Sequence, residues 1–284
     1  MTSRTLLRLN KANIYHSYHG MQDRDVNLVL QKYKQKMKWC NRHRILDIGC
    51  GPGDLSVNYL LPLIPKNGQM LGIDISPSMI QYANFKYKDS RIKFKVMDIS
   101  KPDIGEKYRL VFNSVFSFYC LHWIQDQWNT MKNIYNVLQS GGETLLVFLA
   151  SSPIYTLYEI LSTSPKWSPY MHDYKDAISP YHNSTDPESE IRNLLSDIGF
   201  NVIDCFCSPM SYTMPTKETL YKSIQAVNPF LNRIPQHLLE DYNNDCKTEI
   251  MKGNLCVTSE ETEEVTFSYS LMTVYAEKPK YVNE

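Results

Sequence analysis

Short apolar runs that end near an aspartate recur along the first third of the chain. They cover residues 44–48, 69–74 and 92–98. The segments between them, 54–63 and 78–86, have helical composition, and the second is preceded by Ser76 as an N-cap and Pro77 as the first helical residue. Strands that alternate with helices in this way predict a parallel α/β sheet.

The alternation continues toward the C-terminus with two interruptions. Further strands are expected at 110–116, 144–149, 201–207 and 265–276, a turn at 140–142, and helices from residue 24 onward, at 126–139 and at 187–198. The interruptions, at about 151–185 and 214–262, both follow late strands, so they are expected to meet at one rim of the sheet and form a lid. We therefore expect one domain over 1–284, with its core at about 24–150, 186–213 and 263–279.

Composition and charge exclude several classes of protein. Of the 284 residues, 43% are apolar, and 30 basic residues balance 30 acidic ones. A chain with this balance can bury a core but has no broad positive field for nucleic acid, so no nucleic-acid partner is expected. The longest purely apolar run, 145–150, is far shorter than the roughly 20 residues that span a bilayer. We expect no stable membrane insertion.

The seven cysteines and seven histidines show no CxxC pair, no HExxH and no zinc-type spacing. This pattern favours a reduced, cytoplasmic protein without a metal site. The sequence also lacks heptads, so we expect a monomer or a weak dimer.

The strongest chemical signal is the glycine-rich segment 47–53, Asp-Ile-Gly-Cys-Gly-Pro-Gly, where the first strand turns toward a helix. Ligands of open α/β sheets bind beyond the carboxyl ends of the strands, and glycine lets the backbone approach them. Asp74 ends the second strand and can accept hydrogen bonds from ribose hydroxyls, and Asp98 ends the third and can accept from an adenine amino group. Because Asp54 replaces the small residue of a GxGxxG fingerprint, S-adenosylmethionine is favoured over a nicotinamide.

These residues resemble the class I S-adenosylmethionine-dependent methyltransferases, which share a DxGxGxG turn and acids at the ends of strands two and three. The resemblance narrows over segments 116–127, 164–167, 178–182 and 226–230, which are similar to the insect juvenile hormone acid O-methyltransferases over nearly the whole chain. It implies a Rossmann-like, mostly parallel sheet of seven strands with the last antiparallel, and helical lid insertions after strands five and six. It also implies methyl transfer from S-adenosylmethionine to the carboxylate of juvenile hormone acid or farnesoic acid, with S-adenosylhomocysteine as a product.

The resemblance assigns roles to individual residues. Gln22 and Trp123 would bind the substrate carboxyl as the catalytic pair, and the backbone carbonyl of Phe116, at the end of strand four, would accept from the cofactor's amino group. The expected cofactor-binding residues are Tyr15, Asp47, Gly49, Gly51, Asp74, Ile75, Asp98, Ile99 and Phe116.

Aromatic and aliphatic side chains of the two insertions are candidates for the wall around an isoprenoid tail. The expected substrate-binding residues are Tyr119, His122, Tyr158, Trp167, Tyr170, Tyr181 and Val227, with Ile154, Tyr155, Tyr221, Ile224 and Phe230 as further lid candidates. For His122, two roles remain open at this point, orientation of the carboxylate or capping of its loop.

The chemistry expected of such a site needs no general base, because a carboxylic acid with a pKa near about 4.3 is already ionised at neutral pH. The side chains of Gln22 and Trp123 are donors that can hold a carboxylate without adding a full charge. Two alternatives remain open from the sequence: a methyltransferase for another apolar acid, such as a fatty acid, and a relative that binds lipid acids without turnover.

Overall fold

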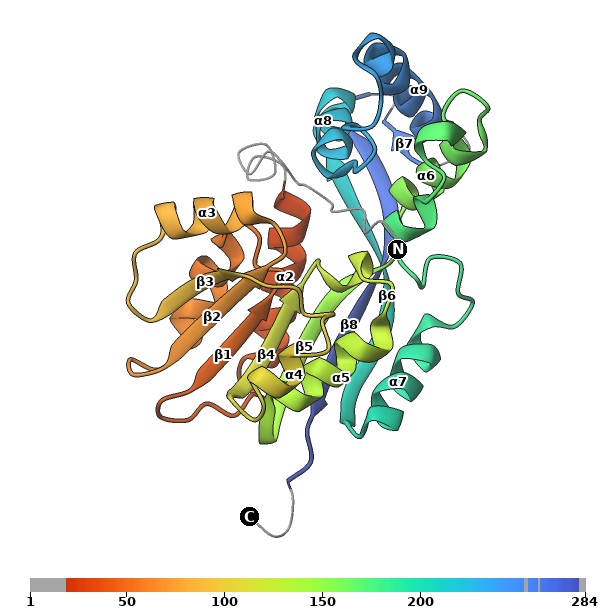
Figure 1. Cartoon of the computed structure of the whole chain (residues 1–284). Coiled ribbons are helices and arrows are strands. Elements are labelled where there is room, and N and C mark those ends of the chain that lie inside the picture. The colour runs from red at the N-terminus through yellow and green to blue at the C-terminus, as the bar shows by residue number, and fades with distance from the viewer. Residues whose placement is uncertain (1–18, 253–254, 260, 281–284) are drawn as a thin grey trace.

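A single mixed sheet organises the protein, as a computed structural model that describes residues 19–252, 255–259 and 261–280 shows (Figure 1). Its strands run in the order β3-β2-β1-β4-β5-β8-β6, and the short β7 pairs with the outer part of β8. The strands are β1 (Arg44–Ile48), β2 (Gln69–Asp74), β3 (Ile92–Val96), β4 (Phe112–Phe118), β5 (Leu138–Ser151), β6 (Asn201–Met214), β7 (Val257–Thr258) and β8 (Val265–Glu277).

The strand directions confirm the predicted fold class. Strands β1 to β5 are parallel to their neighbours, whereas β8 lies antiparallel between β5 and β6. Most residues of the central strands are buried because helices cover both faces of a parallel sheet. The two-residue β7 adds an eighth strand to the seven expected ones.

Alternating side chains of the sheet feed two hydrophobic clusters. Leu145 and Val147 of β5 pack on the face covered by α2 (Gly20–Tyr33) and α3 (Pro77–Lys86). Leu146 and Phe148 point to the other face, which α4 (Ile104–Lys107), α5 (Gln127–Val137) and α7 (Pro187–Ile198) cover (Figure 1).

The lid lies beyond the carboxyl ends of the parallel strands (Figure 1). Its main helices are α6 (Pro153–Thr163), α8 (Lys217–Val227) and α9 (Leu239–Met251), joined by the short turns η4 (Ser168–Tyr170), η5 (Tyr174–Ala177) and η6 (Gln236–Leu238). Trp167 is fully buried among them, with its ring edge-to-face on Tyr242 at 5.0 Å and its indole N–H donating to Asp245 at 2.8 Å. The residue limits drawn between core and insertions stay a prediction.

Several elements differ from their sequence-based limits. The helix expected at 54–63 is the irregular pair η1 (Ser56–Leu60) and η2 (Leu61–Leu63), since Pro62 cannot donate to a continuing helix. β4 starts and ends two residues later than expected, after a turn in which Leu110 has φ +56°. The turn at 140–142 is an irregularity within β5, where Gly141 has φ +74°.

β6 also differs, because it continues to Met214 rather than ending at Cys207. Its last residues pair only with β8, and this two-stranded ribbon carries the chain from the sheet into the lid. Exposed and half-buried residues alternate along this part of β6, which gives it no apolar run to mark it as a strand.

The packing of Trp167 predicts that the lid depends on it. Trp167→Ala should lower the free energy of unfolding by about 3–5 kcal/mol because it leaves a large cavity. Trp128→Ala is the matched control, since Trp128 is 46% exposed, and it should change stability by less than about 0.5 kcal/mol. Urea unfolding followed by circular dichroism measures both, and equal effects of the two substitutions would contradict this account of the lid.

Candidate functional site

A cavity of about 470 Å³ opens between the carboxyl ends of the parallel strands and the lid. One half is built from the sheet side and includes Gly49, Gly51, Asp74, Ile75, Asp98 and Ile99. The other half is apolar and includes Tyr155, Met214, Leu220, Ile224, Val227 and Ile250. Its volume falls within the range of about 300–1,000 Å³ that is typical of small-molecule sites.

The glycine turn after β1 has two distinct tasks. A Cβ on Gly49, which has φ +72°, would lie 2.3 Å from the Cys120 Sγ, so this glycine permits close packing of two loops. A Cβ on Gly51, with φ +54°, would meet nothing within 4 Å. The backbone at Gly51 is therefore open on the cavity side.

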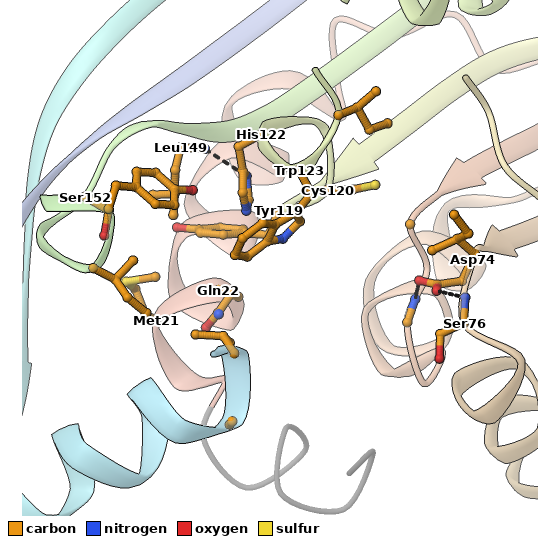
Figure 2. Close-up of a pocket in the computed structure, with 18 of the residues that line it drawn as sticks. Met21, Gln22, Asp74, Ser76, Tyr119, Cys120, His122, Trp123, Leu149 and Ser152 are labelled. Carbon is orange, nitrogen blue, oxygen red and sulfur yellow. Dashed lines mark hydrogen bonds between the residues drawn. The ribbon is translucent and has the colours of Figure 1, made fainter. Parts of the chain in front are cut away.

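Asp74 is fixed at the end of β2 by backbone amides. The N–H of Gly51 donates to its Oδ2 at 2.9 Å and the N–H of Ser76 to its Oδ1 at 2.8 Å (Figure 2). Burial raises the pKa of Asp74, and the two backbone hydrogen bonds oppose that rise. Each carboxylate oxygen can accept more than one hydrogen bond, so Asp74 retains acceptor capacity for a ligand in the cavity.

Asp98 lies two residues beyond β3 and also lines the cavity. The backbone N–H and the hydroxyl of Ser100 donate to its Oδ1 at 3.0 and 2.7 Å. With Ile75 and Ile99 beside them, Asp74 and Asp98 form a groove of two carboxylates and two aliphatic side chains.

Asp47 does not line the cavity, and its contact with a cofactor stays a prediction. It is buried within β1, where the hydroxyl of Ser56 donates to its Oδ2 at 2.5 Å. Burial raises the pKa of Asp47 to about 7, with the Ser56 hydrogen bond opposing and the charge of Asp74 adding to that rise. Asp47 therefore links the end of β1 to the start of η1, which follows the glycine turn.

Phe116 does not line the cavity either. Because β4 extends to Phe118, Phe116 lies inside the sheet, paired with Asp47 on one side and Leu145 on the other. The residues that reach the cavity just after this strand are Tyr119 and Cys120, and the contact of the Phe116 carbonyl with a cofactor stays a prediction.

Gln22 and Trp123 lie close together on the cavity wall, across from Asp74 and Ser76 (Figure 2). Gln22 is in the first turn of α2, and Trp123 ends the short turn η3 (Leu121–Trp123). Among the described residues, nothing bonds to the buried Oε1 of Gln22, and no acceptor meets the indole N–H of Trp123. Both side chains thus keep polar groups for a ligand.

His122 lines the same wall and is buried. Burial lowers the pKa of His122 to about 3, so the ring is neutral at pH 7. The backbone N–H of Leu149 donates to its Nδ1 at 3.2 Å, which leaves the ring proton on Nε2 (Figure 2). His122 thus holds its loop against β5 and also presents a neutral donor.

The structure divides the predicted substrate-binding residues. Tyr119, His122 and Val227 line the cavity, but Tyr158, Trp167, Tyr170 and Tyr181 do not. Tyr158 and Trp167 are fully buried in the lid, and Tyr170 packs against the same cluster. Tyr181 packs on Phe148, and its hydroxyl donates to Gln127 at 3.3 Å. The roles of these four residues in substrate binding therefore stay a prediction.

Other lining residues were not singled out as sites by the sequence. Of the further lid candidates, Ile154, Tyr155 and Ile224 line the cavity, and Tyr221 and Phe230 do not. Met21, Met214, Leu220 and Phe267 also line it. Met214 and Phe267 belong to the two strands of the β6–β8 ribbon. The alternation of residues along these strands is the one feature of the sequence that could have indicated them. Tyr15 lies outside the described residues.

The described part of the chain contains neither a metal-ligating cluster nor a membrane-spanning helix. No group of three or more His, Cys, Asp or Glu side chains there could hold a metal ion. No helix there is long and apolar enough to cross a membrane.

Comparisons with known proteins agree on a methyltransferase. A family model described as a methyltransferase domain matches residues 41–238. The chain is 36% identical over 282 residues to the juvenile hormone acid O-methyltransferase of Drosophila melanogaster, covering 97% of this chain and 95% of that protein. It is also 36% identical over 276 residues to the Bombyx mori protein of the same name, covering 95% of this chain and 98% of that one.

A solved structure with a similar fold is phosphoethanolamine N-methyltransferase 2 of Haemonchus contortus in complex with S-adenosyl-L-methionine. The TM-score is 0.57 at 19% identity, and the match covers 98% of this chain and 59% of that one. At this identity the likeness concerns the fold.

The raised pKa of Asp47 predicts a pH-dependent stability. Because the folded protein holds this proton more tightly than the unfolded chain, with a pKa of about 7 against 3.8, Asp47 lowers the free energy of unfolding as pH rises between those values. Asp47→Asn should make the loss of stability between pH 5 and pH 8 smaller by about 2 kcal/mol. Urea unfolding at both pH values measures it, and an unchanged pH dependence in the variant would contradict the raised pKa.

Proposed function

This chain belongs to the family of juvenile hormone acid O-methyltransferases and carries a methyltransferase domain, and from this premise we propose that it methylates the carboxylate of a sesquiterpenoid acid. S-adenosylmethionine supplies the methyl group when bound. Juvenile hormone acid and farnesoic acid are the acceptors to which the proposal commits. The observation that carries it is the placement of two neutral donors, Gln22 and Trp123, between the sheet half of the cavity and its apolar lid half.

The sheet half fits an adenosine-containing methyl donor. Gly51 leaves its side of the turn open, and Asp74 is fixed with acceptor capacity to spare for vicinal hydroxyls. Asp98 can accept from an exocyclic amino group, while Ile75 and Ile99 offer apolar contacts to a flat base. Carboxylates at this position would repel the phosphates of a dinucleotide, so the charge of the groove favours a donor without phosphates.

The lid half fits an apolar tail. Its wall is formed by Met214, Leu220, Ile224, Val227 and Ile250. A sesquiterpenoid chain has about 15 carbons, and burying them at about 0.8 kcal/mol each gives an upper limit near 12 kcal/mol before ordering costs. Apolar contact alone can thus supply low-micromolar affinity.

Neutral donors suit a carboxylate that must act as a nucleophile. The acid is already ionised at neutral pH, so no residue has to remove a proton. No lysine or arginine of the described chain lines the cavity, and His122 is neutral. A cation there would stabilise the carboxylate in the ground state and leave the barrier to methyl transfer no lower.

Catalysis then depends on position. The Trp123 indole and the Gln22 carboxamide would hold one carboxylate oxygen toward the methyl donor. The Nε2–H of His122 would join them, since His122 lines the same cavity and its ring centre lies 4.9 Å from that of Trp123. Holding two reactants in line contributes about 7–11 kcal/mol to a reaction of this type. The lid excludes water from the same region.

The assignment of the donors predicts the effect of removing each. Gln22→Ala and Trp123→Phe should each lower kcat/KM for farnesoic acid by about tenfold or more, because each removes a hydrogen bond to a charged group. Transfer of label from S-adenosylmethionine to farnesoic acid, juvenile hormone acid and palmitic acid measures this and ranks the acceptors. Gln31→Ala, on the exposed side of the same helix, and Trp128→Phe are the matched controls.

The possible results separate the alternatives. Turnover of both isoprenoid acids but not of palmitic acid supports the proposal. Equal turnover of palmitic acid would replace it with a general apolar-acid methyltransferase. No turnover of any acid, with S-adenosylmethionine still bound by calorimetry, would leave a relative that binds without reacting.

The carboxylate of Asp74 predicts a separate effect on the methyl donor. Asp74→Asn should weaken binding of both S-adenosylmethionine and S-adenosylhomocysteine by about tenfold or more, since the amide has one acceptor oxygen where the carboxylate has two. Isothermal titration measures both affinities. Asp103→Asn, at an exposed position, is the control, and an unchanged affinity in Asp74→Asn would remove Asp74 from the cofactor site.

A further inference from the structure

A buried carboxylate that the proposed reaction does not use lies one turn from Gln22. Asp25 is on α2 and has 0% exposure. Residues three apart in a helix share a face, so the face that presents Gln22 to the cavity also presents Asp25 to the interior. Asp25 itself does not line the cavity.

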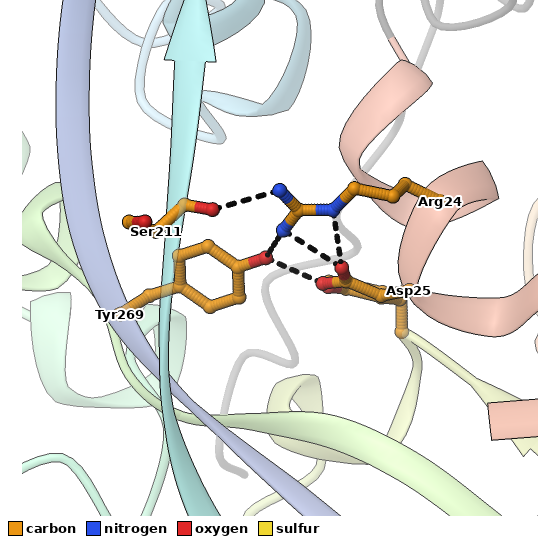
Figure 3. A network of polar contacts seen from close by, with 5 residues as sticks. Arg24, Asp25, Ser211 and Tyr269 are labelled. Carbon is orange, nitrogen blue, oxygen red and sulfur yellow. Dashed lines mark hydrogen bonds and ion pairs between the residues drawn. The ribbon is translucent and has the colours of Figure 1, made fainter. Parts of the chain in front are cut away.

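Three segments of the chain meet on this carboxylate. The hydroxyls of Tyr119 and Tyr269 each donate to the Asp25 Oδ2 at 2.5 Å, and Arg24 pairs with the Oδ1 at 2.8 Å (Figure 3). Tyr119 follows β4, and Tyr269 is on β8 where that strand leaves the sheet for the lid. Asp25 thus joins α2, the end of a central strand and the base of the ribbon.

Arg24 extends this network to the other strand of the ribbon. Its guanidinium donates to the backbone carbonyl of Ser211 at 2.8 Å and to the Tyr269 hydroxyl at 2.6 Å, and it stacks over the Tyr212 ring at 5.0 Å (Figure 3). Its contacts with Asp25 and Tyr269 raise the pKa of Arg24 against the opposing effect of burial, so it stays charged.

Tyr119 brings the network to the cavity. It lines the wall, and it has φ +55°, a left-handed conformation that is unfavourable for a tyrosine. Such a conformation costs on the order of 1–3 kcal/mol and persists where its surroundings enforce it. Its N–H bonds to the Val147 carbonyl at 2.8 Å and its hydroxyl to Asp25, so both ends of the residue are held. Trp123 follows four residues later.

Burial raises the pKa of both tyrosines, and the charge of Asp25 adds to the effect. Both hydroxyls therefore stay protonated and keep donating throughout the pH range in which the protein is folded. A buried ion pair is by itself weak evidence for stability, because its desolvation cost offsets its attraction. Its position beside both donors points to another role.

We propose that Asp25 is a positioning residue, which fixes the separation of Gln22 and Trp123 by holding α2, Tyr119 and Tyr269 on one carboxylate. This inference rests on the proposed function, in which Gln22 and Trp123 together hold the substrate carboxylate. It assigns no contact between Asp25 and substrate. The proposal also includes the β6–β8 ribbon, because Ser211 and Tyr269 belong to the two strands that carry the lid.

Kinetics test the proposal with two variants of different severity. Asp25→Asn removes the charge, and Tyr269→Phe removes one donor while leaving the Arg24–Asp25 pair. Each should lower kcat/KM for farnesoic acid by about fivefold or more and change the Kd of S-adenosylmethionine by less than about twofold, because the methyl-donor groove lies on other strands.

The matched control is Tyr33→Phe. Tyr33 is on the same helix, is equally buried, and donates to Asp204 at 2.8 Å on β6, but it lies at the far end of α2 from Gln22. Loss of the Tyr33 hydroxyl should leave kcat/KM for farnesoic acid within about twofold of the wild type. An equal fall in all three variants would show that tethering of α2 in general matters and would overturn the role of Asp25.

A double-mutant cycle with Gln22→Ala separates positioning from stability. If Asp25 acts by placing Gln22 and Trp123, then Tyr269→Phe should lower kcat/KM by less in the Gln22→Ala background than in the wild type. Effects that multiply in full would overturn the proposal.

A measurement without turnover keeps this proposal apart from the proposed function. The chain has four tryptophans, so labelling with 5-fluorotryptophan gives four ¹⁹F signals, and Trp123→Phe identifies one of them. Tyr269→Phe and Asp25→Asn should shift or broaden the Trp123 signal, and Tyr33→Phe should not. If no acid is methylated, a shifted signal still supports the positioning network, and an unmoved one overturns it.

Discussion

The pairing of β8 on both of its edges determines where the site can form. One edge pairs with β5 as far as Ser151 and Ser270, whereas the other pairs with β6 along its whole length to Met214 and Val265. On the lid side of Ser270, β8 pairs with β6 and, at its end, with the short β7, and this ribbon carries the lid over the carboxyl ends of the parallel strands. Because side chains alternate along a strand, a slip of one residue would turn Phe267 away from the cavity that it lines.

Charge is distributed unevenly across the cavity, and this suits its proposed chemistry. Carboxylates lie on the sheet side at Asp74 and Asp98, where a cationic methyl donor would be held. The donors opposite, Gln22, Trp123 and His122, are neutral. An anionic acceptor placed among neutral donors keeps most of its nucleophilicity, while the carboxylates across the cavity favour binding of a cationic methyl donor over a ligand with phosphates.

Three aspartates show how the local partners decide the task of the same side chain. Asp47 receives one hydroxyl and no cation, so burial dominates and its pKa rises to about 7. Asp74 receives two backbone amides at a strand end and keeps capacity for a ligand. Asp25 receives two tyrosine hydroxyls and an arginine, which makes it a junction between segments.

The sequence by itself determined the parallel half of the sheet and the glycine turn. Apolar runs that alternate with helices, and a cluster of glycines after the first run, are patterns within short stretches of sequence. They therefore do not depend on contacts between distant residues. For the same reason Gly49, Gly51, Asp74 and Asp98 were placed correctly at the cavity. Gln22 and Trp123 came from the family resemblance, since neither a lone glutamine nor a lone tryptophan has a local signal of function.

Only the tertiary structure decided which lid aromatics face the cavity and which fill the lid. Tyr155 and Trp167 are both fully buried and aromatic, yet one lines the wall and the other donates to Asp245 in the lid core. The same holds for Phe116, which lies inside the sheet because β4 runs two residues further than its apolar pattern suggested. The Asp25 junction joins residues up to 244 positions apart in sequence, and such long-range contacts are fixed by strand order and register, which no local pattern encodes.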